Sequence, residues 1–137
     1  MSTPPAALRM VEVSGAEALR LLEGSGPGRL VCVQRDLTVI RPGRHVWEYG
    51  RLIVRTPAPA PAAAVPVTAT YQVDESRAVP GPGWKVTVHG PAEVITDPDE
   101  AACHRRALSG WSPGPHDTLL SLRPETVAGF RLARAEA

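Results

Sequence analysis

Arginines supply most of the side chains that could bind a ligand in this sequence of 137 residues. Arg41, Arg44 and His45 lie close together around the dipeptide Pro42-Gly43. Guanidinium groups bind carboxylates and phosphates through paired N–H donors. The cluster is therefore a candidate site for an anion, and a solvated arginine-rich turn is the alternative that the same residues allow.

Cys103 and His104 would combine a nucleophile with a base, but neighbouring residues on a helix do not face each other. We therefore expect no catalytic pair there, and we expect Cys32, inside an apolar run, to be a core residue. The 4 histidines lack the spacing of a metal site. Serine hydrolase, P-loop and dinucleotide-binding motifs are also absent from the sequence. The sequence thus predicts no metal site and identifies no catalytic residue.

Three tryptophans could stack on a ligand: Trp47, Trp84 and Trp111. Such residues also fill protein cores and dimer interfaces, which is the alternative for each of them. Trp111 is the best candidate for a ligand contact because it follows a predicted helix in a loop flanked by Gly and Pro.

The composition is that of an ordinary globular domain, with 43% hydrophobic residues, 21% charged residues and a net charge of +1. This balance creates no field that would attract nucleic acid or an anionic membrane. The sequence shows no apparent signal peptide and no run of about 18 apolar residues that could cross a bilayer. We expect a cytoplasmic protein without nucleic acid or membrane partners, in which residues 1–13 form a tail and residues 14–134 form one domain.

Two helices are indicated by their start signals. Ser14 with Glu17 three positions later forms a possible capping box, and Gly24 would end this helix. Asp97 followed by Pro98 is a well-matched N-cap for a second helix.

Elsewhere the apolar pattern has the period of two that is typical of strands. Strands are predicted at residues 29–35, at 37–40 with a resumption at 45–49 after Pro42-Gly43, at 51–56, at 67–74, at 84–89 with a continuation through 92–96, at 117–123 and at 127–132. Pro42 should lie at a bulge or a sheet edge because it cannot donate a ladder hydrogen bond. The Pro/Ala tract at 57–64 predicts a loop. The order indicates a mainly β (α+β) fold, a six- to seven-stranded antiparallel β-barrel with two or three short helices.

Several segments resemble the pyridoxamine 5′-phosphate oxidase-like, FMN-binding split-barrel superfamily. The resemblance extends from about Glu17 to Leu132. The similar motifs are G-R-L-V at 28–31, the Pro-containing strand at 40–50, R-T at 55–56, V-D at 73–74, G-W-x-V-x-V-x-G-x-A at 83–92 and P-x-x-V-x-G-x-x-L at 124–132. The resemblance implies a split β-barrel, a homodimer with flavin sites at its interface, and a flavin-dependent oxidoreductase that acts on a small molecule.

The resemblance also implies where FMN would bind. The flavin phosphate would be held at Arg55 and Thr56, which offer a guanidinium fork and a hydroxyl donor. The flavin ring would lie against the backbone of Ile40, Arg41 and Pro42. These residues, together with Trp111, are the candidate cofactor-binding residues.

The sequence departs from the family pattern directly after Thr56. Relatives usually have a Gly-containing turn and a lysine that reaches the phosphate, but residues 57–61 read P-A-P-A-P. Losing such a charged contact costs about 1.5–3 kcal/mol. Two alternatives to an FMN protein therefore stay open: a barrel without flavin that binds another small molecule, and an enzyme that catalyses a non-redox reaction in the former flavin pocket.

Overall fold

The computed structural model describes residues 8–23, 26–34, 36–57, 67–76, 83–110, 114 and 116–134. Within these residues the elements are β1 (Leu8–Val13), α1 (Gly15–Glu23), β2 (Gly28–Gln34), β3 (Leu37–Glu48), β4 (Arg51–Thr56), β5 (Val67–Ser76), β6 (Gly83–Val94), α2 (Pro98–Ala107), β7 (Thr118–Leu122) and β8 (Thr126–Arg134). Trp111 and most of the Pro/Ala tract lie outside the described residues.

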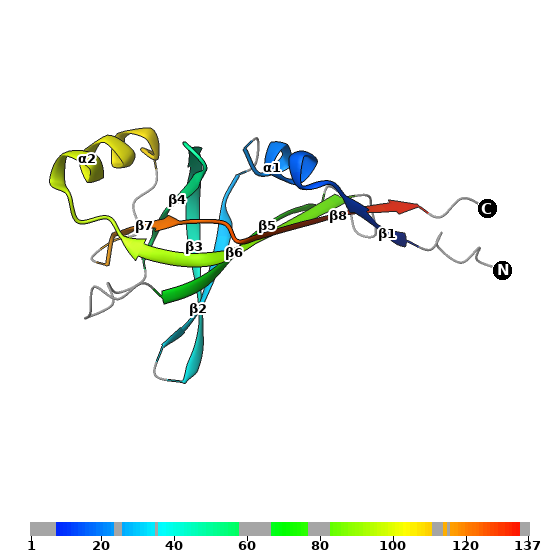
Figure 1. Ribbon diagram of the computed structural model, residues 1–137, viewed down its shortest axis with the longest axis horizontal. Coiled ribbons are helices and arrows are strands. Elements are labelled where there is room, and N and C mark those ends of the chain that lie inside the picture. Colours follow the sequence, from blue (N-terminus) through cyan, green and yellow to red (C-terminus); the bar gives the residue numbers. More distant parts are fainter. Residues whose placement is uncertain are drawn as a thin grey trace.

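The strands form one antiparallel sheet that closes into a six-stranded barrel in the order β6-β5-β2-β3-β4-β7. Strand β8 pairs with the first half of β6, and β1 pairs with β8, so these two strands extend the sheet beyond the barrel (Figure 1). The predicted mainly β barrel with short helices is confirmed. The structure adds β1, a strand within the residues for which the sequence suggested only a tail.

Strand β6 pairs with β5 along one edge, and on its other edge the neighbouring strand changes at Gly90. The first half of the strand pairs with β8 and the last residues pair with β7. A Cβ atom on Gly90 would lie 1.9 Å from the backbone oxygen of Arg123, because the connection between β7 and β8 crosses the strand there. The sequence predicted an interruption at this point, and the structure instead has one continuous strand whose glycine allows the close crossing.

Pro42 lies in the part of β3 that has a hydrogen-bonded strand on one side only. Strand β2 pairs with β3 continuously from Leu37 to Gly43, whereas β4 pairs with β3 from Arg44 onward. The missing N–H of proline therefore breaks no ladder. Of the two expectations for Pro42, the sheet edge is confirmed, and the register shows no bulge at this residue.

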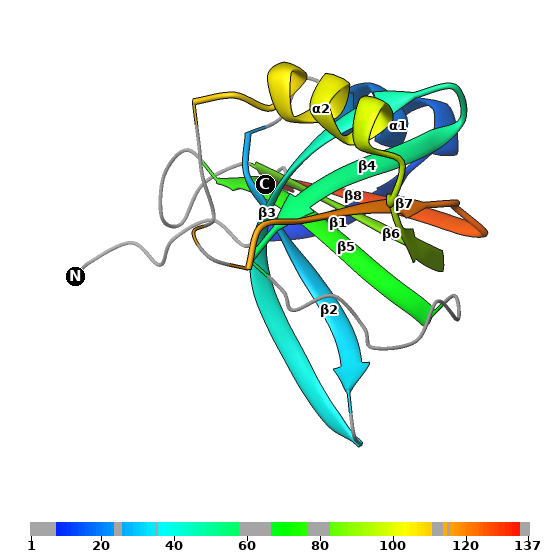
Figure 2. The same ribbon diagram turned by 90° about the vertical axis from the view of Figure 1, so that its left-hand side faces the viewer.

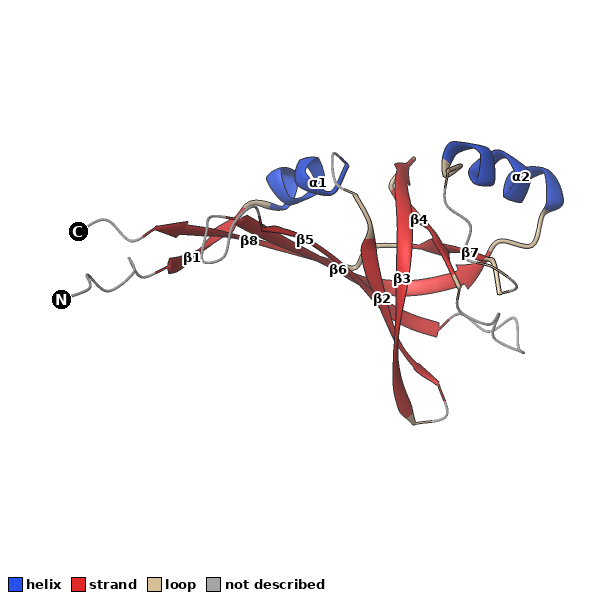
Figure 3. Ribbon diagram, turned by 180° about the vertical axis from the view of Figure 1, so that it is seen from behind, coloured by secondary structure: helices blue, strands red, loops and turns tan. Residues whose placement is uncertain are grey.

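The two helices lie on the same side of the molecule (Figures 1 and 2). Helix α1 begins as predicted, with the Ser14 hydroxyl accepting a hydrogen bond from the Glu17 N–H at 3.2 Å. It buries Ala18 and Leu22 against the barrel, and a Cβ on Gly129 of β8 would lie 2.9 Å from that of Ala18. Figure 3 shows both helices outside the strand layer. Neither described helix is long and apolar enough to span a membrane.

Helix α2 explains why β4 is buried on both faces. Leu52 and Val54 belong to the main core inside the barrel, whereas Ile53 faces a second cluster with Ala101, Leu108 and Leu119. The helix begins as predicted at Pro98, and the Asp97 carboxylate accepts the N–H of Asp99 at 3.2 Å.

Candidate functional site

The pairing of β3 with β4 brings together two parts of the predicted flavin site. Arg44 is opposite Arg55 in the register. The Thr56 hydroxyl, which is fully buried, donates a hydrogen bond of 2.9 Å to the carbonyl oxygen of Pro42. Pro42 and the Arg55-Thr56 pair are therefore neighbours in space.

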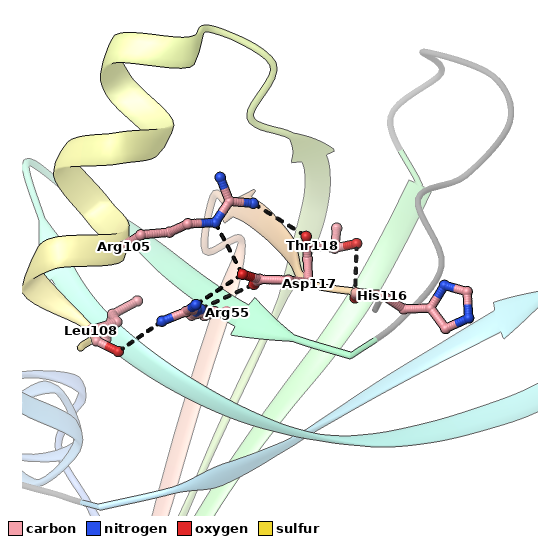
Figure 4. A network of polar contacts seen from close by, with 6 residues as sticks. All are labelled: Arg55, Arg105, Leu108, His116, Asp117 and Thr118. Atoms are coloured by element: carbon pink, nitrogen blue, oxygen red, sulfur yellow. Dashed lines mark hydrogen bonds and ion pairs between the residues drawn. The ribbon is translucent and has the colours of Figure 1, made fainter. Parts of the chain in front are cut away.

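Arg55 is held by the protein itself. Its Nε and Nη2 donate to the two carboxylate oxygens of Asp117 at 3.0 and 2.8 Å, and its Nη1 donates to the Leu108 carbonyl oxygen at 3.2 Å (Figure 4). Only 10% of the Arg55 side chain is exposed. The hydrogen bonds from Arg55 hold the pKa of Asp117 below its usual value, and the same bonds raise the pKa of Arg55. The pair is therefore fully charged at neutral pH.

Asp117 is shared with a second arginine from α2. Arg105 donates from Nε to Asp117 Oδ2 at 3.1 Å and from Nη2 to the Asp117 backbone oxygen at 3.2 Å. Arg105 is partly exposed. Asp117 and Arg105 were not predicted as site residues, because neither belongs to a local sequence motif.

The partners of Arg55 and Thr56 decide whether a flavin phosphate could bind to these two residues. By residue type the pair suits a phosphate, which needs N–H and O–H donors. As they are placed, the Arg55 nitrogens and the Thr56 hydroxyl already donate to Asp117, Leu108 and Pro42. The donors therefore do not fit a phosphate unless one of these contacts is released.

In the structure, the side chains of the cluster around Pro42 point in different directions. Arg41 and Arg44 are exposed, whereas His45 turns inward and contacts Tyr71 and Leu22. Ile40 is 58% exposed on the same strand. The residues predicted to face the flavin ring thus lie in an exposed part of β3.

Cys103 and His104 do not face each other, as the helix geometry predicted. Cys103 is exposed, whereas His104 is 3% exposed and lies between two carboxylates. Its Nδ1 is 3.3 Å from Glu48 and its Nε2 is 3.4 Å from Glu100. Cys32 is buried as predicted, and burial raises the pKa of its thiol. Neither cysteine is part of a nucleophile–base pair among the described residues.

A pocket of about 290 Å³ lies at the start of α2, between that helix and the end of β6. Its polar lining includes Arg51, Glu93, Thr96, Glu100, Ser121 and Arg123. Arg51 forms one wall, where it donates to Glu100 at 2.6 Å and to Ser121 at 3.2 Å. The hydrogen bond from Arg51 lowers the pKa of Glu100. This pocket was not anticipated, because its residues come from distant segments.

Comparison with known proteins gives the same family as the sequence motifs. Residues 14–137 match the family described as pyridoxamine 5′-phosphate oxidase. The uncharacterized protein Rv0080 of Mycobacterium tuberculosis is 33% identical over an alignment that covers 96% of this chain and 91% of that protein.

Solved structures show the same fold at lower identity. An FAD-binding protein from Mesorhizobium loti superposes with a TM-score of 0.71 at 18% identity and covers 93% of this chain and 100% of its own. The FAD binding protein from Mycobacterium smegmatis has a TM-score of 0.66 at 24% identity, covering 88% of this chain and 96% of its own. Both similarities are similarities of fold.

Proposed function

Because the chain belongs to the pyridoxamine 5′-phosphate oxidase family, we propose that it is a flavin-binding split-barrel protein that acts as an oxidoreductase on a small molecule. The observation that supports the proposal is the hydrogen bond from Thr56 to the Pro42 carbonyl oxygen, because it makes neighbours of two residues that the family resemblance implies for the phosphate and the ring. FMN is the flavin that the sequence resemblance implies. FAD is the flavin named for the two structural relatives.

A flavin supplies the redox chemistry of such a protein, and the chain supplies binding and orientation. Such a protein needs no catalytic nucleophile of its own, and among the described residues Cys103 and His104 do not form a nucleophile–base pair. The backbone of β3 around Pro42 would face the ring. Arg55 would face the phosphate once its contact with Asp117 is released.

We also propose that the protein is a homodimer whose second copy covers the hairpin of β2 and β3. This hairpin projects from the barrel in both views (Figures 1 and 2). It carries three exposed apolar side chains, with Val33 at 63% and Ile40 at 58% on one face and Leu37 at 70% on the other. Exposed apolar residues that share a face mark interaction surfaces, so we expect the second copy on the face of Val33 and Ile40. Because Ile40 and Pro42 lie on the same strand, a second copy there would complete a flavin site at the interface.

The test is the absorption spectrum of the purified protein, followed by fluorescence titration with FMN and, separately, with FAD. The expected result is the absorption band of oxidised flavin, or quenching of flavin fluorescence at micromolar concentration. A colourless protein that quenches neither flavin would refute the proposal. Comparison of the two titrations then identifies the preferred flavin.

The second candidate function is binding of another small polar molecule without flavin. The observation that favours it is the pocket at the start of α2, lined by Arg51, Glu100 and Arg123, together with the internal partners of Arg55. A pocket that combines convergent charged groups with this volume is a reasonable binding site. A colourless protein would direct the search to this pocket, with Arg123→Gln as the first variant.

A further inference from the structure

Asp117 gives Arg55 the same contact that a phosphate would give it. The carboxylate accepts two side-by-side hydrogen bonds from Nε and Nη2, at 3.0 and 2.8 Å. Guanidinium groups bind carboxylates and phosphates in this same bidentate geometry. An anionic ligand and Asp117 would therefore compete for one edge of Arg55.

The rest of the Arg55 guanidinium offers no second anion site. Nη1 donates to the Leu108 carbonyl oxygen at 3.2 Å, and only 10% of the side chain is exposed. A ligand that reaches Arg55 must therefore replace Asp117 rather than bind beside it.

Arg105 makes this replacement feasible. It already donates to Asp117 Oδ2 at 3.1 Å and is partly exposed (Figure 4). A carboxylate released from Arg55 would keep a cationic partner, so no unpaired charge would be left in a buried place. Arg55, Arg105 and Asp117 together have two positive charges and one negative charge, which leaves one positive charge for an incoming anion.

We propose that Asp117 is the resident anion of Arg55 and that it sets the affinity of this site for the phosphate of a flavin. The inference rests on the proposed flavin function. In the flavin-free protein Asp117 occupies the fork of Arg55. In the complex the phosphate takes that fork and Asp117 stays with Arg105.

The decisive variant is Asp117→Asn, which keeps the shape and one oxygen acceptor but removes the competing charge. We expect Asp117→Asn to bind FMN at least tenfold more tightly than the wild type in a fluorescence titration. As a second probe, inorganic phosphate should raise the midpoint of thermal unfolding more in Asp117→Asn than in the wild type. Asp74→Asn is the matched control, because Asp74 also pairs with an arginine, Arg29, at 3.0 Å but is half-exposed on another face.

The outcomes separate this inference from the proposed function. Wild-type FMN binding that Asp117→Asn leaves unchanged or weakens would overturn the inference and keep the flavin function. If neither protein binds flavin, a phosphate response gained by Asp117→Asn and removed by adding Arg55→Lys would support the resident-anion role and refute the flavin function. If Asp117→Asn changes neither response, the inference is wrong.

Discussion

The imidazole Nδ1 of His45 lies 2.7 Å from the phenol oxygen of Tyr71, and the two rings meet edge to face at 70°. The other ring nitrogen, Nε2, is 2.8 Å from the carbonyl oxygen of Leu22. Because a carbonyl oxygen only accepts, Nε2 carries a hydrogen. Burial lowers the pKa of His45 and so favours the neutral ring, whose bare Nδ1 accepts from the Tyr71 hydroxyl; this hydroxyl also lies 3.2 Å from the Gly43 carbonyl oxygen, farther than the 2.7 Å to Nδ1. This chain of contacts connects the last turn of α1 with β3 and β5.

The first prediction concerns pH. Burial lowers the pKa of His45 below its ordinary value of 6.5. As the pH falls through that value, the unfolded chain binds a proton that the folded protein does not, so the free energy of unfolding decreases. We expect urea denaturation at stepped pH to show this loss between about pH 7 and 5, with a shallower slope for His45→Gln. His116→Gln, at an exposed position, should keep the wild-type slope. Equal slopes for His45→Gln and wild type would contradict the assignment.

The second prediction concerns the phenol group. Tyr71→Phe removes the hydroxyl that contacts His45 Nδ1 and the Gly43 carbonyl oxygen, in a place where Tyr71 is 0% exposed. Leaving a buried acceptor without its partner costs about 1–3 kcal/mol, and chemical denaturation should show this loss of stability. Tyr49→Phe is the control, because Tyr49 is 94% exposed and loss of its hydroxyl should have little effect on stability. A Tyr71→Phe protein as stable as wild type would show that the contact is energetically neutral.

The third prediction concerns the crossing at Gly90. In Gly90→Ala the new methyl group would lie 1.9 Å from the Arg123 backbone oxygen, and this neighbour is not a flexible side chain that can move away. The β7–β8 connection must shift, so we expect a loss of about 3 kcal/mol or more in the free energy of unfolding, as for strongly overpacked sites. Gly15→Ala, at the start of α1 with nothing within 4 Å of the added atom, should be neutral or slightly stabilising. Similar stabilities for both variants would argue against a close crossing.

The fourth prediction concerns assembly. Val33→Glu places a charge on the face of the hairpin that carries Ile40, where the second copy is proposed to bind, and burying it there would be unfavourable. Sedimentation or light scattering should show a dimer for the wild type and a monomer for Val33→Glu. Met10→Glu, which changes an exposed apolar residue on β1, should remain a dimer. A wild-type monomer would refute the proposed homodimer.

Much of this fold could be predicted from the sequence alone because its signals are local. The Ser14 and Asp97 N-caps act within three residues, and both helices begin where these caps place them. The alternation in residues 51–56 and the other strand segments fixed the fold class, since a period of two depends only on neighbouring residues. The family motifs added the split-barrel architecture.

The tertiary structure decided which partners these residues have. Arg55 and Asp117 are 62 positions apart, and no local pattern connects them. The direction of His45, the partner change at Gly90 and the strand β1 likewise depend on segments that meet only when the barrel closes. A sequence pattern reports the propensity of a segment, whereas hydrogen-bond partners follow from the register of strands brought together over long separations. For this reason the sequence motif predicted a flavin phosphate at Arg55, and only the folded chain showed that Asp117 pairs with this side chain.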